Sequence, residues 1–170
     1  MPLNIQLSIM QLTQFSDIGL RLLMYLAQEQ RETPAITLAE VSSQFVIPRN
    51  HLAKVAAKLV KGGWVEAIRG RSGGLRLAMK PADIRIGQVL RLLEGHANVI
   101  DCEKLQCKLN TGCELKLALA DAYAAFYAVL DKHTLADVTQ GMAGKEIVRM
   151  QQGFMAIYLE KTPERKSEVH

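Results

Sequence analysis

Three cysteines lie close together in the chain and are the residues best suited to metal or redox chemistry. Cys102, Cys107 and Cys113 follow the spacing C-x4-C-x5-C, in and directly after a loop-like stretch, residues 96–112. Three thiolates that converge from one loop suit a soft metal ion or an iron–sulfur cluster. Cys113 is expected at the N-terminus of a helix, where the helix dipole favours a thiolate and a negatively charged cluster.

The cysteine spacing alone leaves other roles open. Zinc sites prefer tighter C-x2-C pairs, and the sequence has none, but a structural zinc ion or a thiol redox switch stays an alternative. An odd number of cysteines fits a disulfide framework poorly. A nucleophilic cysteine would need a positioned base, and His96 is the only histidine nearby, so we expect no enzymatic activity.

A second group of functional side chains is basic and falls between residues 49 and 76. In this range seven lysines and arginines stand against one acid, Glu66. Arginine can donate two hydrogen bonds to guanine, and asparagine can pair with adenine, so a helix carrying both can read DNA sequence. The glycines of RGRSGG, residues 69–74, let the backbone approach a phosphate or a minor groove. The predicted DNA-contacting residues are Thr37, Arg49, Asn50, His51, Lys54, Lys58, Arg69, Arg71, Ser72, Gly73 and Gly74.

The elements expected to position these basic residues begin with two helices. Apolar residues recur at helical spacing from Thr13 until Thr33-Pro34 breaks the pattern. Thr37 can then cap a short helix, and Glu40, three residues later, completes a capping box.

A third helix and a hairpin follow. The helix starts after Pro48, ends at Gly62-Gly63, and carries one apolar stripe. Residues 64–68 and 75–78 read as two strands around the RGRSGG turn. The stripe consists of Leu52, Val55, Ala56, Leu59 and Val60. Helix, helix, turn, helix and hairpin is the order of a winged helix-turn-helix, so the predicted fold class is mainly α with a small β-hairpin.

Beyond the hairpin the sequence predicts a helix that follows residues 81–83 and ends at Gly95, and then a long helix from Cys113 to about Lys132. The apolar residues of the long helix cover more than one face, which indicates a helix–helix dimer interface. The pattern weakens beyond Gly141, and the last ten residues read as a disordered tail. The expected organisation is an N-terminal extension (1–9), the winged helix-turn-helix (10–95), the cysteine loop (96–113), the dimerisation helix (113–140) and a C-terminal extension (141–170).

Composition sets limits on location and partners. The 170 residues carry a net charge of +4, so an anionic partner is indicated only because the positive charges cluster. The chain has no apolar run near the roughly 20 residues that span a membrane. The start, MPLNIQLSIM, lacks the basic region of a signal peptide. We therefore expect a cytoplasmic protein with no membrane partner, in a compartment where thiols stay reduced.

Several stretches resemble a known family. LTQFSDIGLRLLMYLA, IPRNHLAKVAAKLVKGGWVEAIRGRSGGLRLA, IRIGQVLRLLEG and the C-x4-C-x5-C motif are closely similar to the NsrR group, the nitric-oxide-sensing members of the winged-helix iron–sulfur regulators that also include IscR. The resemblance covers roughly residues 10–137. It implies a homodimeric repressor that binds double-stranded DNA at a palindromic operator and senses nitric oxide through a labile iron–sulfur cluster.

The resemblance also bears on the fourth ligand of that cluster. IscR-like members have a longer first cysteine gap and a histidine shortly after the third cysteine, where this chain has Lys116. In NsrR-like proteins with a 4Fe–4S cluster, an aspartate of the partner's first helix is the fourth ligand, and Asp17 matches it. This implies a 4Fe–4S cluster held by Asp17 and the three cysteines, with 2Fe–2S as an alternative. From the residues alone, Asp17 is a first-turn acid that pairs with the helix dipole or with Arg21. The other acceptable fourth ligands are His96, Asp101 and Glu103.

Overall fold

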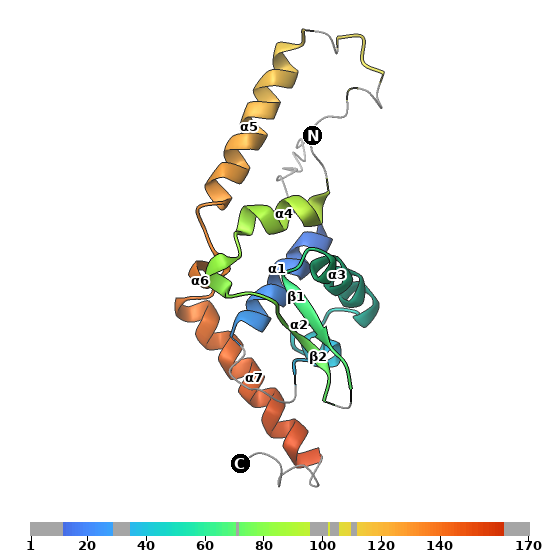
Figure 1. The fold of residues 1–170 in the computed structure, drawn as a ribbon, viewed down its shortest axis with the longest axis vertical. Coiled ribbons are helices and arrows are strands. Elements are labelled where there is room, and N and C mark those ends of the chain that lie inside the picture. Colours follow the sequence, from blue (N-terminus) through green and yellow to red (C-terminus); the bar gives the residue numbers. More distant parts are fainter. Residues whose placement is uncertain are drawn as a thin grey trace, which may run out of the picture.

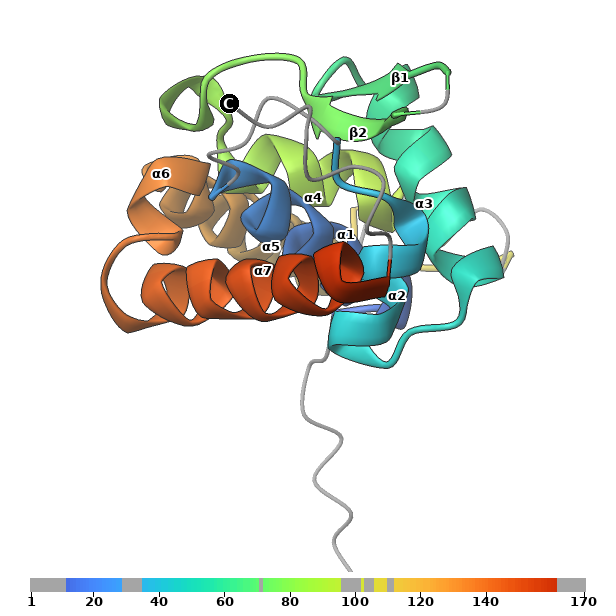
Figure 2. The same ribbon diagram turned by 90° about the horizontal axis from the view of Figure 1, so that it is seen from below.

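The computed structural model describes residues 12–28, 35–70, 72–95, 102, 106–109 and 112–161, and a small hairpin lies at one edge of its group of helices (Figures 1 and 2). The elements are α1 (Gln14–Ala27), α2 (Leu38–Phe45), α3 (Arg49–Lys61), β1 (Val65–Ile68), β2 (Gly74–Leu77), the 3-10 helix η1 (Pro81–Asp83), α4 (Ile86–Glu94), α5 (Glu114–Leu130), α6 (Leu135–Val138) and α7 (Gly141–Lys161). The predicted fold class, mainly α with a two-stranded hairpin, is confirmed. Within the described ranges no helix is long and apolar enough to cross a membrane.

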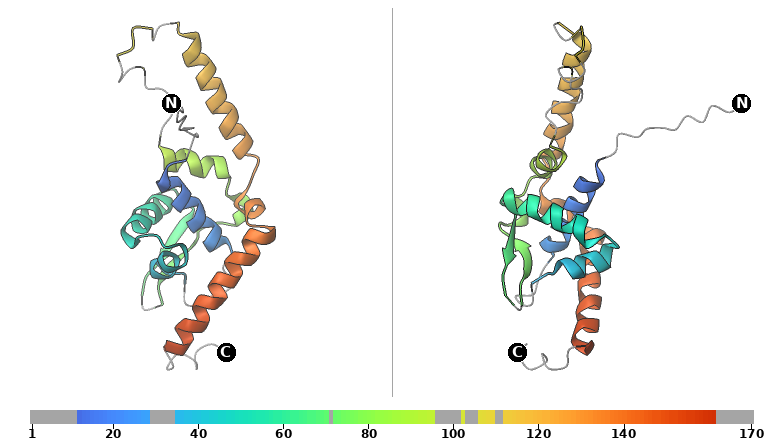
Figure 3. Two further views of the ribbon diagram at one scale, coloured as in Figure 1. Left: turned by 180° about the vertical axis from the view of Figure 1, so that it is seen from behind. Right: turned by 90° about the vertical axis from the view of Figure 1, so that its right-hand side faces the viewer.

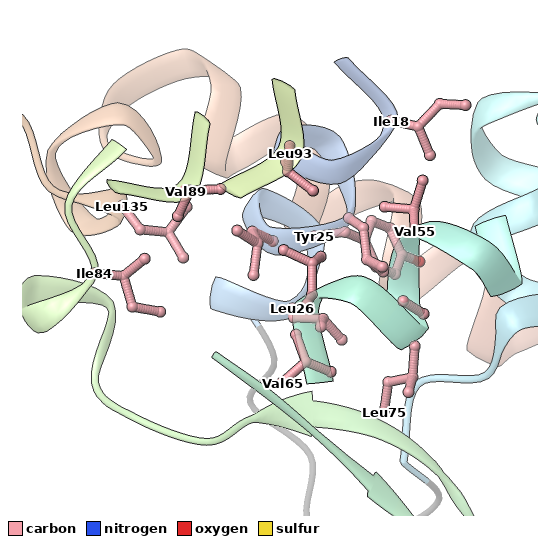
Figure 4. Close-up of a cluster of buried hydrophobic side chains, with 14 of the residues drawn as sticks. Ile18, Tyr25, Leu26, Val55, Val65, Leu75, Ile84, Val89, Leu93 and Leu135 are labelled. Atoms are coloured by element: carbon pink, nitrogen blue, oxygen red, sulfur yellow. The ribbon is translucent and has the colours of Figure 1, made fainter. Parts of the chain in front are cut away.

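Helix α1 forms the centre of the core. It starts at Thr13, whose hydroxyl accepts the N–H of Ser16 at 3.2 Å, a normal N-cap. Ile18, Leu22 and Leu26 recur at i, i+4 spacing and are at most 3% exposed, which makes this face apolar. Figure 4 shows α1 side chains packed among residues from α3, α4, α6 and the hairpin. The predicted break at Thr33-Pro34 lies outside the described residues; α1 itself ends at Ala27.

The helix-turn-helix consists of α2 and α3. The Thr37 hydroxyl accepts the Glu40 N–H at 3.1 Å, which confirms the predicted N-cap. Val46 adopts the left-handed conformation (φ 54°) and ends α2. The stripe of α3 packs on α1 as predicted, with Leu52, Val55 and Leu59 fully buried. The assignment of Val60 to that stripe was wrong: it is 39% exposed, because a residue next to Leu59 is turned about 100° around the helix, away from α1.

The hairpin, the wing of this fold, is joined to the segment that precedes α2. β1 and β2 are antiparallel in the register Val65↔Leu77, and the Leu75 N–H donates to the carbonyl of Ile36 at 2.7 Å. Gly74 permits this approach, since a Cβ there would lie 2.5 Å from the Ile36 carbonyl oxygen. The start of α2 and the wing are therefore held as one unit.

The long helix α5 extends away from the rest of the molecule, as Figures 1 and 3 show. Its bounds confirm the predicted helix after Cys113, and α4 ends at Gly95 as expected. Leu115, Leu117 and Val129 of α5 are 64%, 57% and 54% exposed in the single chain. An apolar surface of this kind is what a second helix would cover.

Helix α7 was not predicted, because the helical pattern of the sequence weakens beyond Gly141. It has 21 residues, and part of it lies beside α1, where the Gln151 side-chain amide donates to the Tyr25 carbonyl at 2.8 Å; α7 is seen from below in Figure 2. Of the predicted disordered tail, Lys161 is the last residue of α7, and 162–170 lie outside the described residues, as does the extension 1–9.

Candidate DNA-reading surface and cysteine loop

The N-terminal half of α3 presents the predicted reading residues to solvent. Arg49, Asn50, His51 and Lys54 are all exposed, and Lys58, one turn further along, is half-buried. Asn50, His51 and Lys54 lie on the side opposite the buried stripe, and Arg49 is exposed at the start of the helix. The helix can therefore pack on α1 and still offer polar side chains to a groove. The His51 N–H donates both to the Asn50 side-chain oxygen at 2.9 Å and to the Pro48 carbonyl at 3.1 Å.

The wing places its turn next to β1 and close to the start of α2. Arg69 and Ser72 are exposed, while Arg71 lies outside the described residues. The Gly73 N–H donates to the Gly70 carbonyl at 3.0 Å and closes the turn. The Ala35 N–H donates to the Ser72 carbonyl at 3.3 Å, which brings the Thr37 cap and the wing together. The structure thus gathers Thr37, Ser72 and Gly73 from sequence positions far apart.

A buried contact that the sequence analysis missed holds α2 on α1. Glu40 is 1% exposed, and its carboxylate accepts the Tyr25 hydroxyl at 2.9 Å. The Tyr25 ring also packs edge-on against Phe45, 5.7 Å between centroids. The capping-box pattern had accounted for Glu40 as a cap residue, and nothing local in the sequence pairs it with a tyrosine fifteen positions earlier. This contact fixes the first helix of the motif, on which α3 in turn rests.

The three cysteines differ in exposure and are free thiols. Cys102 is buried (8% exposed), Cys107 is exposed and Cys113 is half-buried. The Cys107 N–H donates to the Cys102 carbonyl at 3.0 Å, so the first two cysteines belong to one turn. Cys113 is the N-cap of α5, at the helix N-terminus where it was predicted.

The donor chemistry of the cysteine loop fits a soft metal or an iron–sulfur cluster, because it offers three thiols and a helix N-terminus. Among the described residues, no three His, Cys, Asp or Glu side chains are grouped to hold a metal ion. The alternative fourth ligands His96, Asp101 and Glu103 lie outside the described residues.

Asp17 lies in the first turn of α1, where both carboxylate oxygens accept the Arg21 Nε–H at 2.9 Å. The i, i+4 pair expected from the residues is therefore present, and the Asp17 side chain is 49% exposed. The N-cap of the same helix is anchored on α4, since the Thr13 N–H donates to Glu94 Oε1 at 2.9 Å. The end of α5 that Cys113 caps is well separated from α1 in Figures 1 and 3, so one chain does not bring Asp17 and Cys113 together.

The chain matches known transcription regulators over most of its length. The family model Rrf2, described as an iron-dependent transcriptional regulator, matches residues 12–141. The HTH-type transcriptional regulator NsrR of Bacillus subtilis (strain 168) is 42% identical over 134 residues, which is 77% of this chain and 91% of that protein.

Solved structures show the same fold. The global cysteine regulator CymR of B. subtilis has a TM-score of 0.62 at 26% identity, with 76% of this chain and 96% of that chain covered. IscR of T. potens has a TM-score of 0.60 at 27% identity, with coverages of 75% and 85%. The matching family consists of transcriptional regulators and not of enzymes, as the sequence predicted. The match spans α1 through α6, and the chain therefore belongs to the Rrf2 family of transcriptional regulators.

Proposed function

We propose that the chain is a homodimeric repressor that binds a palindromic operator and senses nitric oxide through a labile iron–sulfur cluster. The observation that carries this proposal is the combination of 42% identity to NsrR with three free thiols in a C-x4-C-x5-C motif. The description of the matching family as iron-dependent supports it. A regulator of this kind acts in the cytoplasm.

DNA reading is assigned to α3 and the wing. The exposed N-terminal turns of α3 enter the major groove, with Arg49 and Asn50 on base edges and Lys54 and Lys58 on phosphates. The wing approaches the backbone or the minor groove through the residues of its turn. These are Arg69, Arg71, Ser72, Gly73 and Gly74. Thr37, at the N-terminus of α2, is positioned by its bridge to the wing to contact a phosphate.

Dimerisation is assigned to α5. Its 17 residues form a helix about 25 Å long, and Leu115, Leu117 and Val129 are left exposed in the single chain. Leu115 and Val129 lie on one face of α5, whereas Leu117, two residues from Leu115, points to the opposite side. Full burial of an aliphatic side chain contributes about 1.5–3 kcal/mol, so two per subunit offset part of the entropy lost on association. A two-fold pair of α5 helices also gives the two recognition helices a fixed separation, which a palindromic operator requires.

Cys102, Cys107 and Cys113 are proposed to hold the cluster, preferably 4Fe–4S, with Asp17 of the partner subunit as the fourth ligand. When bound, the cluster supplies iron that reacts with nitric oxide. Asp17 can reach a partner because its side chain is half exposed and the start of its helix, α1, lies far from the Cys113 end of α5 in Figure 1. Its pair with Arg21 is no obstacle, since exposed i, i+4 ion pairs are worth only about 0.3–0.5 kcal/mol. A ligand that crosses the dimer would tie one subunit's loop to the other subunit's first helix.

The ligand assignment is tested with matched variants of anaerobically purified full-length protein, measured by iron and sulfide content and visible absorption. Cys107→Ser is expected to lose the cluster. Asp17→Ala is expected to change the cluster spectrum and its stability, whereas Arg21→Ala, which breaks the same ion pair but removes no ligand, keeps both. Equal effects of Asp17→Ala and Arg21→Ala would overturn the role of Asp17. A colourless wild-type protein with stoichiometric zinc, or with no metal and redox-active thiols, would overturn the cluster itself.

A further inference from the structure

The attachment of α5 to the DNA-reading head is confined to one end of the helix. Across Glu114–Leu130, all of which the structure describes, Tyr127 is the one buried residue, at 3% exposure. Tyr127 lies in the last turn, whereas Cys113 caps the first. Figure 1 and both views of Figure 3 show the same arrangement, with the start of α5 far from α1 and its end beside α4 and α6.

The contact at that end is built from charged and aromatic groups of α4 and α5. Arg91, in α4, donates from Nη1 to Asp131 Oδ1 at 3.0 Å and from Nη2 to Asp131 Oδ2 at 2.6 Å. The Arg91 Cζ also lies 4.7 Å from the centroid of the Tyr127 ring. The Tyr123 hydroxyl donates to the Tyr127 hydroxyl at 3.1 Å, which adds a contact one turn earlier. Two parallel hydrogen bonds and a stacked ring together fix the direction of the guanidinium, not only its distance.

The backbone reinforces this contact on both sides. The Ile86 N–H donates to the His133 carbonyl at 3.0 Å, and the Leu135 N–H donates to the Ile84 carbonyl at 2.8 Å. Gly87 of α4 faces Asp131 so closely that a Cβ at this position would overlap the Asp131 carboxylate. The start of α4 and the turn after α5 are therefore held against each other along several residues, and the angle between the two helices is set there.

Because α5 is held at one end only, a small rotation at that end produces a large displacement at the other. Fourteen residues separate Cys113 from Tyr127, which at 1.5 Å per residue is about 21 Å. If α5 rotates by about 10° about Tyr127, its Cys113 end moves by roughly 4 Å. Conversely, if the contact at Tyr127 is rigid, a displacement of roughly 4 Å at the Cys113 end rotates the DNA-reading head by about 10°. Arg91 lowers the pKa of the Asp131 carboxyl, so the pair stays charged at neutral pH and keeps its two-point geometry.

We propose that Arg91, Tyr127 and Asp131, named here the α4–α5 clamp, are positioning residues that transmit the state of the cysteine loop to the DNA-reading head. The clamp converts movement of the cysteine end of α5 into rotation of the head. This inference rests on the proposed function, because it assigns the route by which a change at the cysteines alters DNA affinity.

The test compares wild type with Arg91→Gln and Asp131→Asn, and with Arg149→Gln as a control that breaks an exposed ion pair on α7. For each full-length protein the Kd for operator DNA is measured at fixed salt with the metal bound and after chelation. The ratio of the two Kd values reports coupling. We expect both clamp variants to keep the metal content of wild type. The ratio of the two Kd values is expected to be at least tenfold smaller in the clamp variants than in wild type, and unchanged in the control. A merely structural role would weaken both forms equally and leave the ratio unchanged, and that result would overturn the clamp.

Two further measurements keep the clamp falsifiable. If a single variant fails to fold, the double variant Arg91→Asp with Asp131→Arg, which exchanges the two charges, is expected to restore the wild-type ratio of Kd values. A double variant that folds but does not restore this ratio would count against a role for the ion pair. Amide hydrogen exchange supplies a readout without DNA: metal removal should alter exchange in α4 of wild type and not of Asp131→Asn. Equal responses of α4 in both proteins would overturn the clamp. A wild type that binds DNA equally with and without metal refutes the proposed function instead, so the two failures are distinguishable.

Discussion

Substitution of Lys54 by glutamine is expected to change the salt dependence of DNA binding by a calculable amount. Lys54 is exposed on α3, one turn after Asn50 and opposite the buried Leu52 and Val55. Under the proposed function, its ammonium group contacts a DNA phosphate. If two subunits read the operator, as proposed, one substitution removes two phosphate contacts.

The magnitude follows from counterion release. With about four phosphate contacts per subunit, the dimer has about eight, and the slope of log affinity against log salt is near −7. Loss of two contacts at about 0.9 each moves the slope to about −5.4. Between 50 and 200 mM salt, the affinity of wild type then falls by about 2 × 10⁴-fold and that of the variant by about 2 × 10³-fold.

The assay is fluorescence anisotropy with a labelled operator at five salt concentrations. Lys145→Gln is the matched control, since it removes the same charge from an exposed position on α7. Its slope should equal that of wild type. The assignment of α3 to the groove is refuted if Lys54→Gln keeps the wild-type slope, or if both variants reduce it equally.

Three further predictions concern the scaffold. Tyr25→Phe removes a hydrogen bond from the buried Glu40 carboxylate and is expected to cost about 1–3 kcal/mol, or about 2–4 °C in Tm per kcal/mol, by thermal unfolding. An unchanged Tm would contradict the importance of this contact. Leu115→Glu places a charge on the exposed face of α5 and should give monomers in sedimentation while circular dichroism stays native; a persistent dimer would place the interface elsewhere. Asp131→Asn should lower stability to urea at neutral pH. Because the folded-state pKa of Asp131 is depressed, this difference should shrink as pH falls below about 4, and a pH-independent difference would rule out the charged pair as its cause.

The reading head was predictable because its signals are local. The caps at Thr37 and Gly95, the stripe of α3 and the RGRSGG turn each identify an element within a few residues, and the structure has all of them. A local pattern does not decide which of two adjacent apolar residues is buried: Val60 is as apolar as Leu59 and still faces solvent.

Helix α7 shows what local patterns cannot supply. Gly141, Gly144 and Gly153 lower its intrinsic helix propensity, and its two adjacent glutamines interrupt an apolar stripe. The helix is held by tertiary contacts with α1, among them the hydrogen bond from Gln151 to a backbone carbonyl, and such contacts leave no periodic trace in the sequence.

The candidate sites show the same division between local and distant information. Residue type and spacing were enough to nominate the cysteines and the basic face of α3, because metal binding and DNA binding depend on particular kinds of side chain. The contacts that hold these groups in place join distant positions. Tyr25 meets Glu40, and Arg91 meets Asp131 forty residues later, and neither pair can be inferred from one sequence.

The central claim, that a nitric-oxide-sensitive cluster controls DNA binding, is tested most directly by one titration. Anaerobically purified full-length protein is bound to its operator at fixed salt, and nitric oxide is added stepwise while visible absorption and DNA anisotropy are recorded together. We predict that the cluster absorption is lost and that DNA affinity falls in parallel, with no response in Cys107→Ser. Unchanged DNA affinity after the cluster absorption has gone would contradict the claim.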